Sequence, residues 1–414
     1  MNPFLFNSWF VFAALFLVVL LLPFKKGKSW AFTLVAVGEI VLGPYPSLPV
    51  RLFYVGMCFF VLLVAWIGGR LRGVSGEKKS RGAITASLVV TFLPLFFFKL
   101  IIAVVPVLVE LISQGRNHID ATSLLPVGMS YFTFRAASYL IELYRGTIEP
   151  VSFRKFVNYA FFWPTLIAGP IERPGPFFSQ AEQMVKPDRA DITYGLYRIG
   201  AGFFKKTVLA AMWFQIARPF LYLSDGKFDY NLGLFTVPHL WLCILAYYAY
   251  LYLDFSGYSD LAIGVSRMLG FRIMENFRRP YMATNPAEFW RNWHISMTGW
   301  ITDYIYYPLG GNRKGVRRAT INTFIAMITV GAWHGLNFHF LAFGAYHATL
   351  LVLYRNWRKQ WRDRWFGGSL PGPSWVWSIG GWLLTLMLLL FGWSLFLFPV
   401  GKSLAIWAKM LGLS

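Results

Sequence analysis

The chain has 414 residues, of which 57% are hydrophobic, 19% aromatic and only 14% charged. A soluble globular domain is roughly 45–50% apolar and about 25% charged. Because the apolar excess is spread along the whole chain, it excludes a soluble enzyme, a disordered chain and a disulfide scaffold. The composition predicts an integral membrane protein that crosses the bilayer several times.

The charge balance is 39 Lys and Arg against 18 Asp and Glu, a net charge of +21. In a soluble protein this excess would suggest nucleic-acid binding. Here the basic residues lie in short clusters between apolar runs, which is typical of cytoplasmic loops, so we expect no nucleic-acid partner. Cys58 and Cys243 lie in apolar segments. They predict buried thiols rather than a zinc site or a disulfide framework.

Apolar segments follow one another along the chain, and most are long enough to cross a hydrocarbon core of about 30 Å as a helix. They are residues 5–24, 30–48, 51–70, 83–113, 124–145, 157–170, 196–222, 232–270, 319–333, 336–354 and 376–399. Pro94 and Pro106 suggest that segment 83–113 is two helices. Segment 157–170 is short and ends in Gly169-Pro170, which suggests a re-entrant or interrupted element. The fold class predicted is all-α, with roughly 11 transmembrane or re-entrant helices.

The N-terminal apolar run is not expected to be a cleavable signal peptide, because lysines follow it and no basic residue precedes it. Basic residues cluster in the loops 25–28 and 70–82, whereas the loop 44–50 has no charge. Since positive loops prefer the cytoplasm, the N-terminus is predicted to be extracytoplasmic.

Ionisable groups at membrane depth are costly, so each is a candidate for function. His334 follows the apolar run 319–332 in the sequence Trp333-His334-Gly335. The run corresponds to about 21 Å of helical rise, which places the histidine well inside the bilayer zone. A neutral imidazole in a dry site can take up a proton. A histidine that bonds a neighbouring carbonyl group across a helix pair is an equally good interpretation.

A second region, residues 288–304, carries an aromatic pattern. The apolar residues on one side of a helix would be Trp290, Trp293, Met297, Trp300 and Ile301, and the polar residues elsewhere Glu288, Arg291, Thr298 and Thr302. This pattern fits an interfacial amphipathic helix. An aromatic membrane anchor is the simpler interpretation, and His294 fits a satisfied interface histidine equally well.

Two further polar stretches interrupt apolar sequence. Asp254, Ser256 and Asp260 lie within one run, but no G-x-S-x-G motif is present, so a broken helix that lines a polar cavity is favoured over a nucleophile. The segment 169–174 contains Glu172 and Arg173, which suggests either a loop clamp or, preferably, a solvated turn.

The histidines show no metal-ligand spacing, since His334 and His339 are five residues apart without an acidic or cysteine partner nearby. No metal site is expected. No Walker A or Rossmann fingerprint is present either, which disfavours ATP-driven transport and a bound dinucleotide.

Taken together, these residues resemble the membrane-bound O-acyltransferase family over about residues 90–355, in particular the bacterial branch that modifies cell-surface polymers. The motifs that carry the resemblance are Leu125–Phe134, Ala168–Ile171, Asp254–Asp260, Glu275–Phe277, Phe289–Ser296 and Gly331–Gly335. Their order and the 40-residue step from His294 to His334 make the match specific. Residues 304–313 look like the alginate and exopolysaccharide acetylation subfamily. The compact length and Ala345-Tyr346-His347 look more like the teichoic-acid D-alanylation subfamily.

The resemblance implies a ring of tilted helices around a thin centre, where a cytoplasmic and an extracellular funnel meet. It implies a single membrane domain over residues 1–414, with N-terminal helices in 5–113, a catalytic core in 124–355 and C-terminal helices in 376–414. His334 maps onto the catalytic histidine of the family. His294 maps onto a second residue implicated in activity. The location implied is the bacterial cytoplasmic (inner) membrane.

The reaction implied moves an acyl group, with acetyl favoured over D-alanyl, from a cytoplasmic thioester to a hydroxyl outside. The donor would be acetyl-CoA or an acyl-phosphopantetheine carrier protein, and no cofactor is expected to stay bound. The acceptor would be a cell-surface polysaccharide or an extracytoplasmic transferase partner. His334 would act as general base, and His294 would orient the donor or polarise its carbonyl group. The residues expected to bind substrate are Trp293, Trp333, Arg291, Asn292, Ser256, Asp254, Asp303 and Tyr304.

Two rival functions stay open at this point. A polymer or lipid transporter without chemistry of its own would also use broken helices and intramembrane charges, although no inverted repeat or ATP motif supports it. Lipid O-acylation within the same superfamily is the other rival, and the bacterial-type motifs disfavour it.

Overall fold

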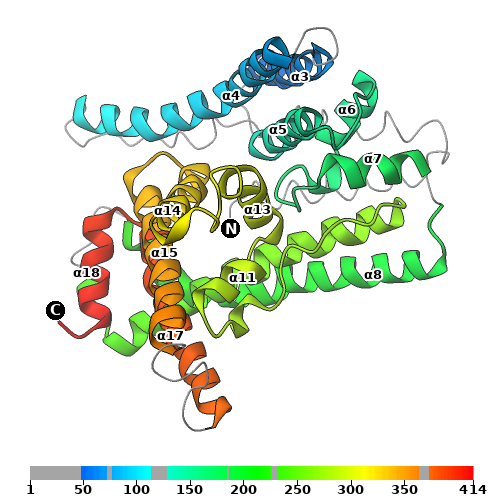
Figure 1. Ribbon diagram of the computed structural model, residues 1–414. Helices are drawn as coiled ribbons and strands as arrows, with labels where there is room; N and C mark the ends of the chain where they lie inside the picture. Colours follow the sequence, from blue (N-terminus) through cyan, green and yellow to red (C-terminus); the bar gives the residue numbers. More distant parts are fainter. Residues whose placement is uncertain are drawn as a thin grey trace. The chain divides into compact units, whose positions relative to one another are not determined.

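The computed structural model describes residues 48–71, 77–112, 128–183, 186–224, 232–362 and 373–413, and within these ranges it contains helices and no strand (Figure 1). The all-α prediction is confirmed. The helices are α3 (Leu48–Arg70), α4 (Glu77–Ile112), α5 (Met129–Arg145), α6 (Phe153–Ala160), η3 (Trp163–Thr165), α7 (Pro174–Gln183), α8 (Arg189–Phe203), η4 (Phe204–Leu209), α9 (Ala210–Leu221), η5 (Tyr222–Ser224), α11 (Val237–Met268), η6 (Pro280–Met282), α12 (Pro286–Asn292), α13 (Ile295–Ile301), η7 (Thr302–Tyr306), α14 (Gly315–His334), α15 (Phe338–Asn356), η8 (Trp357–Arg362), α17 (Ser374–Leu397) and α18 (Val400–Met410). The expected segment 5–24, nearly all of segment 30–48 and the N-terminal orientation lie outside the described residues.

Four of the described helices are long and apolar enough to cross a membrane. They are Leu52–Arg70 in α3, Arg81–Val105 in α4, and the helices α11 and α17. Large apolar side chains such as Phe96 and Phe97 are exposed on α4, as expected for a surface that faces lipid. The protein is therefore a multi-pass membrane protein, while the ring and the funnels stay predictions.

Helix α4 corrects one expectation, because residues 77–112 form a single continuous helix and not two. Pro94 and Pro106 both lie inside it. A proline removes only one backbone N–H from the helix ladder, and a break would leave several unpaired groups at membrane depth. Continuity is therefore the less costly outcome in this long apolar sequence.

The described residues form two compact units. The first contains residues up to Gly200 together with Ser259–Met274, and the second contains Ala201–Tyr258 and Glu275 onward. The core of the first unit is apolar and includes Cys58, which is buried as predicted. Cys243 is buried in the second unit.

A buried arginine holds the irregular segment of the first unit. Arg135 on α5 is fully buried and donates to the carbonyl groups of Tyr159, Ala160, Phe162 and Thr165 at 2.9–3.3 Å. These carbonyls lie where α6 ends and the chain bends, and only those of Tyr159 and Phe162 also accept a backbone N–H there, at 3.4 and 3.2 Å. The prediction of an interrupted element in 157–170 is thereby confirmed, and the arginine supplies the donors that the interruption requires.

In the second unit, α14 and α15 lie side by side because glycines allow their backbones to touch (Figure 1). A Cβ atom at Gly331 would lie 2.1 Å from the carbonyl oxygen of Phe340, and one at Gly344 would lie 2.4 Å from that of Met327. No other residue type fits at these contacts without displacing a helix. The pair places His334 at the end of α14, directly after this close approach.

Candidate active site

His294 lies at a sharp bend between two short helices. The chain forms α12 over Pro286–Asn292 and α13 over Ile295–Ile301, and His294 between them has φ 45°, in the left-handed region. The region thus contains two short helices and not the single amphipathic helix that the pattern also fitted, and the favoured aromatic membrane anchor stays a prediction. The residues predicted to share the apolar side are all buried, namely Trp290, Trp293, Met297, Trp300 and Ile301. An unusual backbone at a non-glycine residue is often found at functional sites.

Asn276 holds both the backbone and the ring at this bend. Its carbonyl oxygen accepts from Ile295 N at 2.9 Å, and its side-chain Oδ1 accepts from Ser296 N at 3.3 Å and Ser296 Oγ at 2.8 Å. The same Oδ1 lies 3.1 Å from His294 Nδ1. Because the backbone N–H of Ser296 identifies this atom as the amide oxygen, which only accepts, the hydrogen of the neutral imidazole is assigned to Nδ1.

His294 consequently presents the lone pair of Nε2. The side chain is only 1% exposed, and Nε2 has no hydrogen-bond partner among the described residues. Burial lowers the pKa of His294 to about 3, so the imidazole is neutral at physiological pH. A buried acceptor without a partner suits a group that a substrate N–H or O–H completes.

His334 is joined to His294 through one indole ring. The Trp333 ring lies 5.5 Å from the His294 ring and 4.7 Å from the His334 ring, centroid to centroid. His334 is half-buried, and Phe396 packs edge-on against it at 4.8 Å. The structure therefore brings the two predicted histidines into one aromatic cluster, although they lie 40 residues apart in the sequence.

Trp293, the residue before the bend, is surrounded by aromatic rings. It stacks on Phe289 at 5.5 Å and contacts Phe277 at 5.2 Å, Trp393 at 5.4 Å and Tyr248 at 6.1 Å. Such packing excludes water from its surroundings, which is the condition that an activated ester needs to avoid hydrolysis.

The polar stretch at Asp254–Asp260 lies inside the continuous helix α11, so the expected broken helix is wrong. A π-helical turn, η4, brings Lys206 to Asp254, and the two side chains form a partly buried ion pair. Gly257 lets this neighbouring segment approach, since a Cβ there would lie 2.9 Å from the carbonyl oxygen of Gly202. Pairing of the charge removes the reason for the helix to break.

The remaining predicted substrate-binding residues occupy different positions. Ser256 is buried, and its Oγ has no hydrogen-bond partner among the described residues. Arg291 is exposed, whereas Asn292 is half-buried and its carbonyl oxygen accepts from Arg278 N at 3.0 Å. Asp303 and Tyr304 lie on η7, beyond α13, where the Tyr304 ring packs on Trp300 at 5.0 Å.

Sequence reasoning missed two residues that support the site. Asn276 belongs to a quoted motif, but its role depends on a contact across 18 residues. His347 on α15 is buried, and its Nδ1 accepts from Trp290 Nε1 at 3.3 Å. No local signal marks either contact, because each depends on a distant partner.

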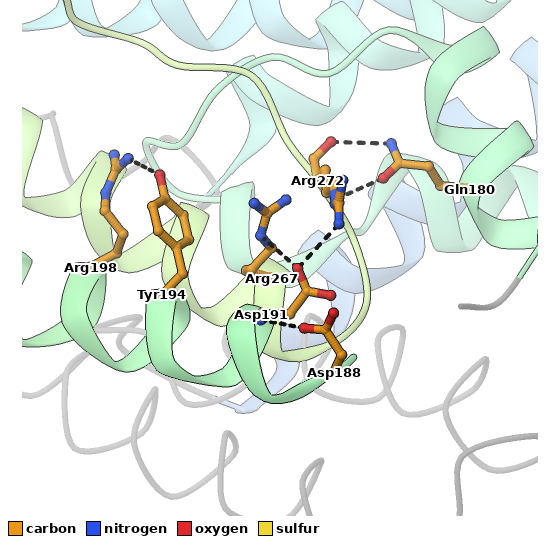
Figure 2. Close-up of polar contacts among 7 residues, drawn as sticks. All are labelled: Gln180, Asp188, Asp191, Tyr194, Arg198, Arg267 and Arg272. Carbon is orange, nitrogen blue, oxygen red and sulfur yellow. Dashed lines mark hydrogen bonds and ion pairs between the residues drawn. The ribbon is translucent and has the colours of Figure 1, made fainter. Parts of the chain in front are cut away.

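The first unit contains a polar network of a different kind, shown in Figure 2. Asp191 lies 3.0 Å from Arg267 Nε and 3.4 Å from Arg272, and its backbone N–H donates to Asp188 at 2.7 Å. Gln180 exchanges two hydrogen bonds with the backbone of Arg272, at 2.7 and 3.1 Å. The network ties the start of α8 to the end of α11 and to the segment that follows it, so its role is structural.

Glu172 corrects the last expectation. It is 5% exposed and accepts from Met274 N at 2.7 Å, so segment 169–174 contains a loop clamp and is not a solvated turn. Burial raises the pKa of Glu172 to about 7, despite the opposing effects of the Met274 N–H, Arg135 and Arg173.

The amino-acid sequence is similar to that of a known protein family and of several named proteins. Residues 77–398 match the family model described as membrane-bound O-acyltransferase. The chain is similar to the probable alginate O-acetylase AlgI of Pseudomonas aeruginosa, 34% identical over 397 residues that cover 93% of this chain and 71% of that protein. It is 28% identical over 363 residues to a teichoic acid D-alanyltransferase of Bacillus subtilis, covering 83% and 84% of the two chains. A peptidoglycan O-acetyltransferase of Helicobacter pylori is 30% identical over 309 residues, which span 68% of this chain and 56% of that protein.

Proposed function

Because the chain belongs to the membrane-bound O-acyltransferase family and is thus an O-acyltransferase in class, we propose that it carries an acyl group across the membrane. The donor is a cytoplasmic thioester, acetyl-CoA or an acylated phosphopantetheine carrier protein. The acceptor is a hydroxyl of an extracytoplasmic polysaccharide, or of a partner transferase that passes the acyl group on. Acetyl is favoured over D-alanyl, since the P. aeruginosa relative is named an O-acetylase and shares the higher identity.

The observation that carries the proposal is the aromatic cluster that contains His294, Trp333 and His334. In the reaction, His334 takes the proton of the acceptor hydroxyl, and the oxygen of that hydroxyl attacks the thioester carbonyl carbon. The new C–O bond forms, the C–S bond breaks, and the departing sulfur takes the proton from His334. Proton transfer of this kind typically contributes about 10²–10⁴-fold.

The role of His294 is to orient the donor. A histidine that polarises a carbonyl group must donate an N–H to it, whereas the contact with Asn276 assigns the hydrogen to Nδ1 and leaves Nε2 as an acceptor. His294 therefore accepts a hydrogen bond, for example from an amide N–H of the donor. The packing around Trp293 and Trp333 keeps water from the thioester.

The test compares His334→Ala and His294→Ala with His239→Ala, an exposed histidine of the same unit, at equal amounts of membrane protein. The measurement is the ester content of the cell-surface polysaccharide in cells that depend on each variant. We expect the first to lose at least 100-fold, the second at least tenfold, and the control to match wild type. Wild-type ester content with His334→Ala would exclude the general-base role.

D-alanyl transfer toward teichoic acid is the second candidate, supported by the B. subtilis relative. Mass analysis of the esterified product separates the two acyl groups. A transporter role is the third candidate. Export of polymer that continues unchanged when acylation is lost in a deletion strain excludes transport as the main function.

A further inference from the structure

Two buried side chains of the second unit carry hydrogen-bond donors that the mechanism above does not use. Tyr248 on α11 is 3% exposed and Trp393 on α17 is 4% exposed. Neither the Tyr248 Oη nor the Trp393 Nε1 has a hydrogen-bond partner among the described residues. Most buried polar groups in proteins are paired, and pairing matters more in helices that are apolar enough to cross a membrane, as both are. Two unpaired donors in such helices call for an explanation, and a ligand that brings acceptors would supply one.

The two rings form one surface next to the histidines. Tyr248 and Trp393 are stacked, with centroids 5.9 Å apart and planes at 24°, and both contact Trp293. Trp393 lies 5.6 Å from Phe396, which in turn packs on His334 at 4.8 Å. The Phe396 ring thus lies between the Tyr248–Trp393 pair and His334. On the other side, Trp293 connects the pair to the bend at His294.

The chemistry of the pair selects the ligand. An indole N–H only donates, and a phenol donates readily, so the ligand must bring acceptor oxygens. The rings that pack on the pair belong to Tyr247, Trp293, Phe343 and Phe396, and none of them carries a charge that could compensate a charged ligand for its lost hydration. A sugar brings many hydroxyls that each need a partner, whereas a slender chain with two amide groups offers one carbonyl oxygen to each of the two donors and can direct an amide N–H to an acceptor such as His294 Nε2.

We propose that Tyr248 and Trp393 bind carbonyl oxygens of the neutral arm of the acyl donor, the chain of amide groups that ends in the thioester. This assignment rests on the proposed function and adds the residues that hold this part of the donor. Coenzyme A and a carrier protein present the same arm, so the shared chemistry is what the pair recognises.

The test uses Tyr248→Phe and Trp393→Phe in the purified full-length protein, with S-acetylpantetheine as the probe. The first substitution deletes only a hydroxyl, and the second replaces the indole by a smaller ring without a donor. Because the deleted donors have no protein partner, Tyr248→Phe should unfold at the same temperature as wild type or higher. We expect about fivefold to tenfold weaker binding of the probe for each variant, measured by calorimetric titration.

Matched controls come from donors that are already paired in the same unit. The Tyr346 Oη donates to the carbonyl oxygen of Leu388 at 2.8 Å, and Trp407 Nε1 donates to that of Phe391 at 3.0 Å. Tyr346→Phe and Trp407→Phe should lower the unfolding temperature and leave probe binding unchanged. A structural role for Tyr248 would make its variant behave as these controls do.

Wild-type probe binding in Tyr248→Phe and Trp393→Phe would overturn the assignment, as would a wild-type protein that transfers acyl groups but does not bind the probe. An increased KM for the polysaccharide acceptor alone would also overturn it.

Parallel assays with acetyl-CoA and with an acetylated carrier protein identify the source of the arm, and the variants should raise the KM of whichever donor is used. A wild-type protein that binds the probe but esterifies no acceptor contradicts the proposed function and leaves this assignment intact.

Discussion

The Asp191 network of the first unit consists of charged side chains that form ion pairs, whereas the aromatic cluster around His294 in the second unit contains neutral polar atoms without a hydrogen-bond partner among the described residues. In the network, Arg267 and Arg272 share Asp191, and Arg198 lies 2.6 Å from Asp260. In the cluster and next to it, three polar atoms have no partner among the described residues, namely Tyr248 Oη, His294 Nε2 and Trp393 Nε1. Ion pairs hold helices together, whereas a buried polar group without a partner can be completed by a ligand. The comparison predicts that substitutions in the Asp191 network lower stability and leave acyl transfer unchanged, whereas substitutions around the histidines lower acyl transfer.

Among the substitutions that test this comparison, the largest effect is expected at Gly331, where α14 meets α15. In Gly331→Ala the new methyl group would lie 2.1 Å from the carbonyl oxygen of Phe340, so the end of α14 that carries His334 must move. We expect a loss of about 1–3 kcal/mol of stability and at least tenfold lower acyl transfer, measured by thermal unfolding and by product formation. Gly380→Ala is the control, because a Cβ there meets nothing within 4 Å. Wild-type transfer by Gly331→Ala would show that the position of His334 does not depend on this contact.

A smaller effect is expected at Asp191, and on stability alone. In Asp191→Asn, Arg267 and Arg272 lose their shared carboxylate, which should cost about 1–2 kcal/mol, because Arg272 is largely exposed and contributes little. Transfer per folded molecule should stay within twofold of wild type. Asp188→Asn serves as the control, since an amide oxygen can still accept from Asp191 N. Lost activity at unchanged stability would contradict the division between the two regions.

The smallest effect is a pH dependence at Glu172. Because its folded-state pKa is raised to about 7, the protonated carboxyl group is favoured in the folded protein. Its contribution to stability is fully present below the ordinary pKa of about 4.5 and is lost as the pH rises through 7. Glu172→Gln keeps an acceptor for Met274 N and does not titrate, so it should gain stability over wild type between pH 5 and 8. Parallel unfolding curves for the two proteins across this range would contradict the assignment.

Local sequence predicted the helices and the division of buried from exposed residues well. Trp290, Trp293 and Trp300 are buried as their spacing required. The motif histidines His294 and His334 both contact the Trp333 ring. Apart from the continuous helix α4, the errors share one physical cause. Expectations failed where a distant partner changed the cost of a polar group, as Lys206 does for Asp254 and the Met274 N–H does for Glu172. The helical break at His294 likewise depends on Asn276, which lies 18 residues earlier.

The sequence by itself determined that this protein is an all-helical membrane protein of the O-acyltransferase type, because hydrophobicity, charge clusters and motifs are properties of consecutive residues. Tertiary structure alone decided which polar atoms are paired. It assigns the hydrogen of His294 to Nδ1 through Asn276, and it leaves Tyr248 and Trp393 as donors without a protein acceptor. The reason is that a hydrogen bond depends on distance and direction in space, and residues far apart in the chain meet only after the helices have packed.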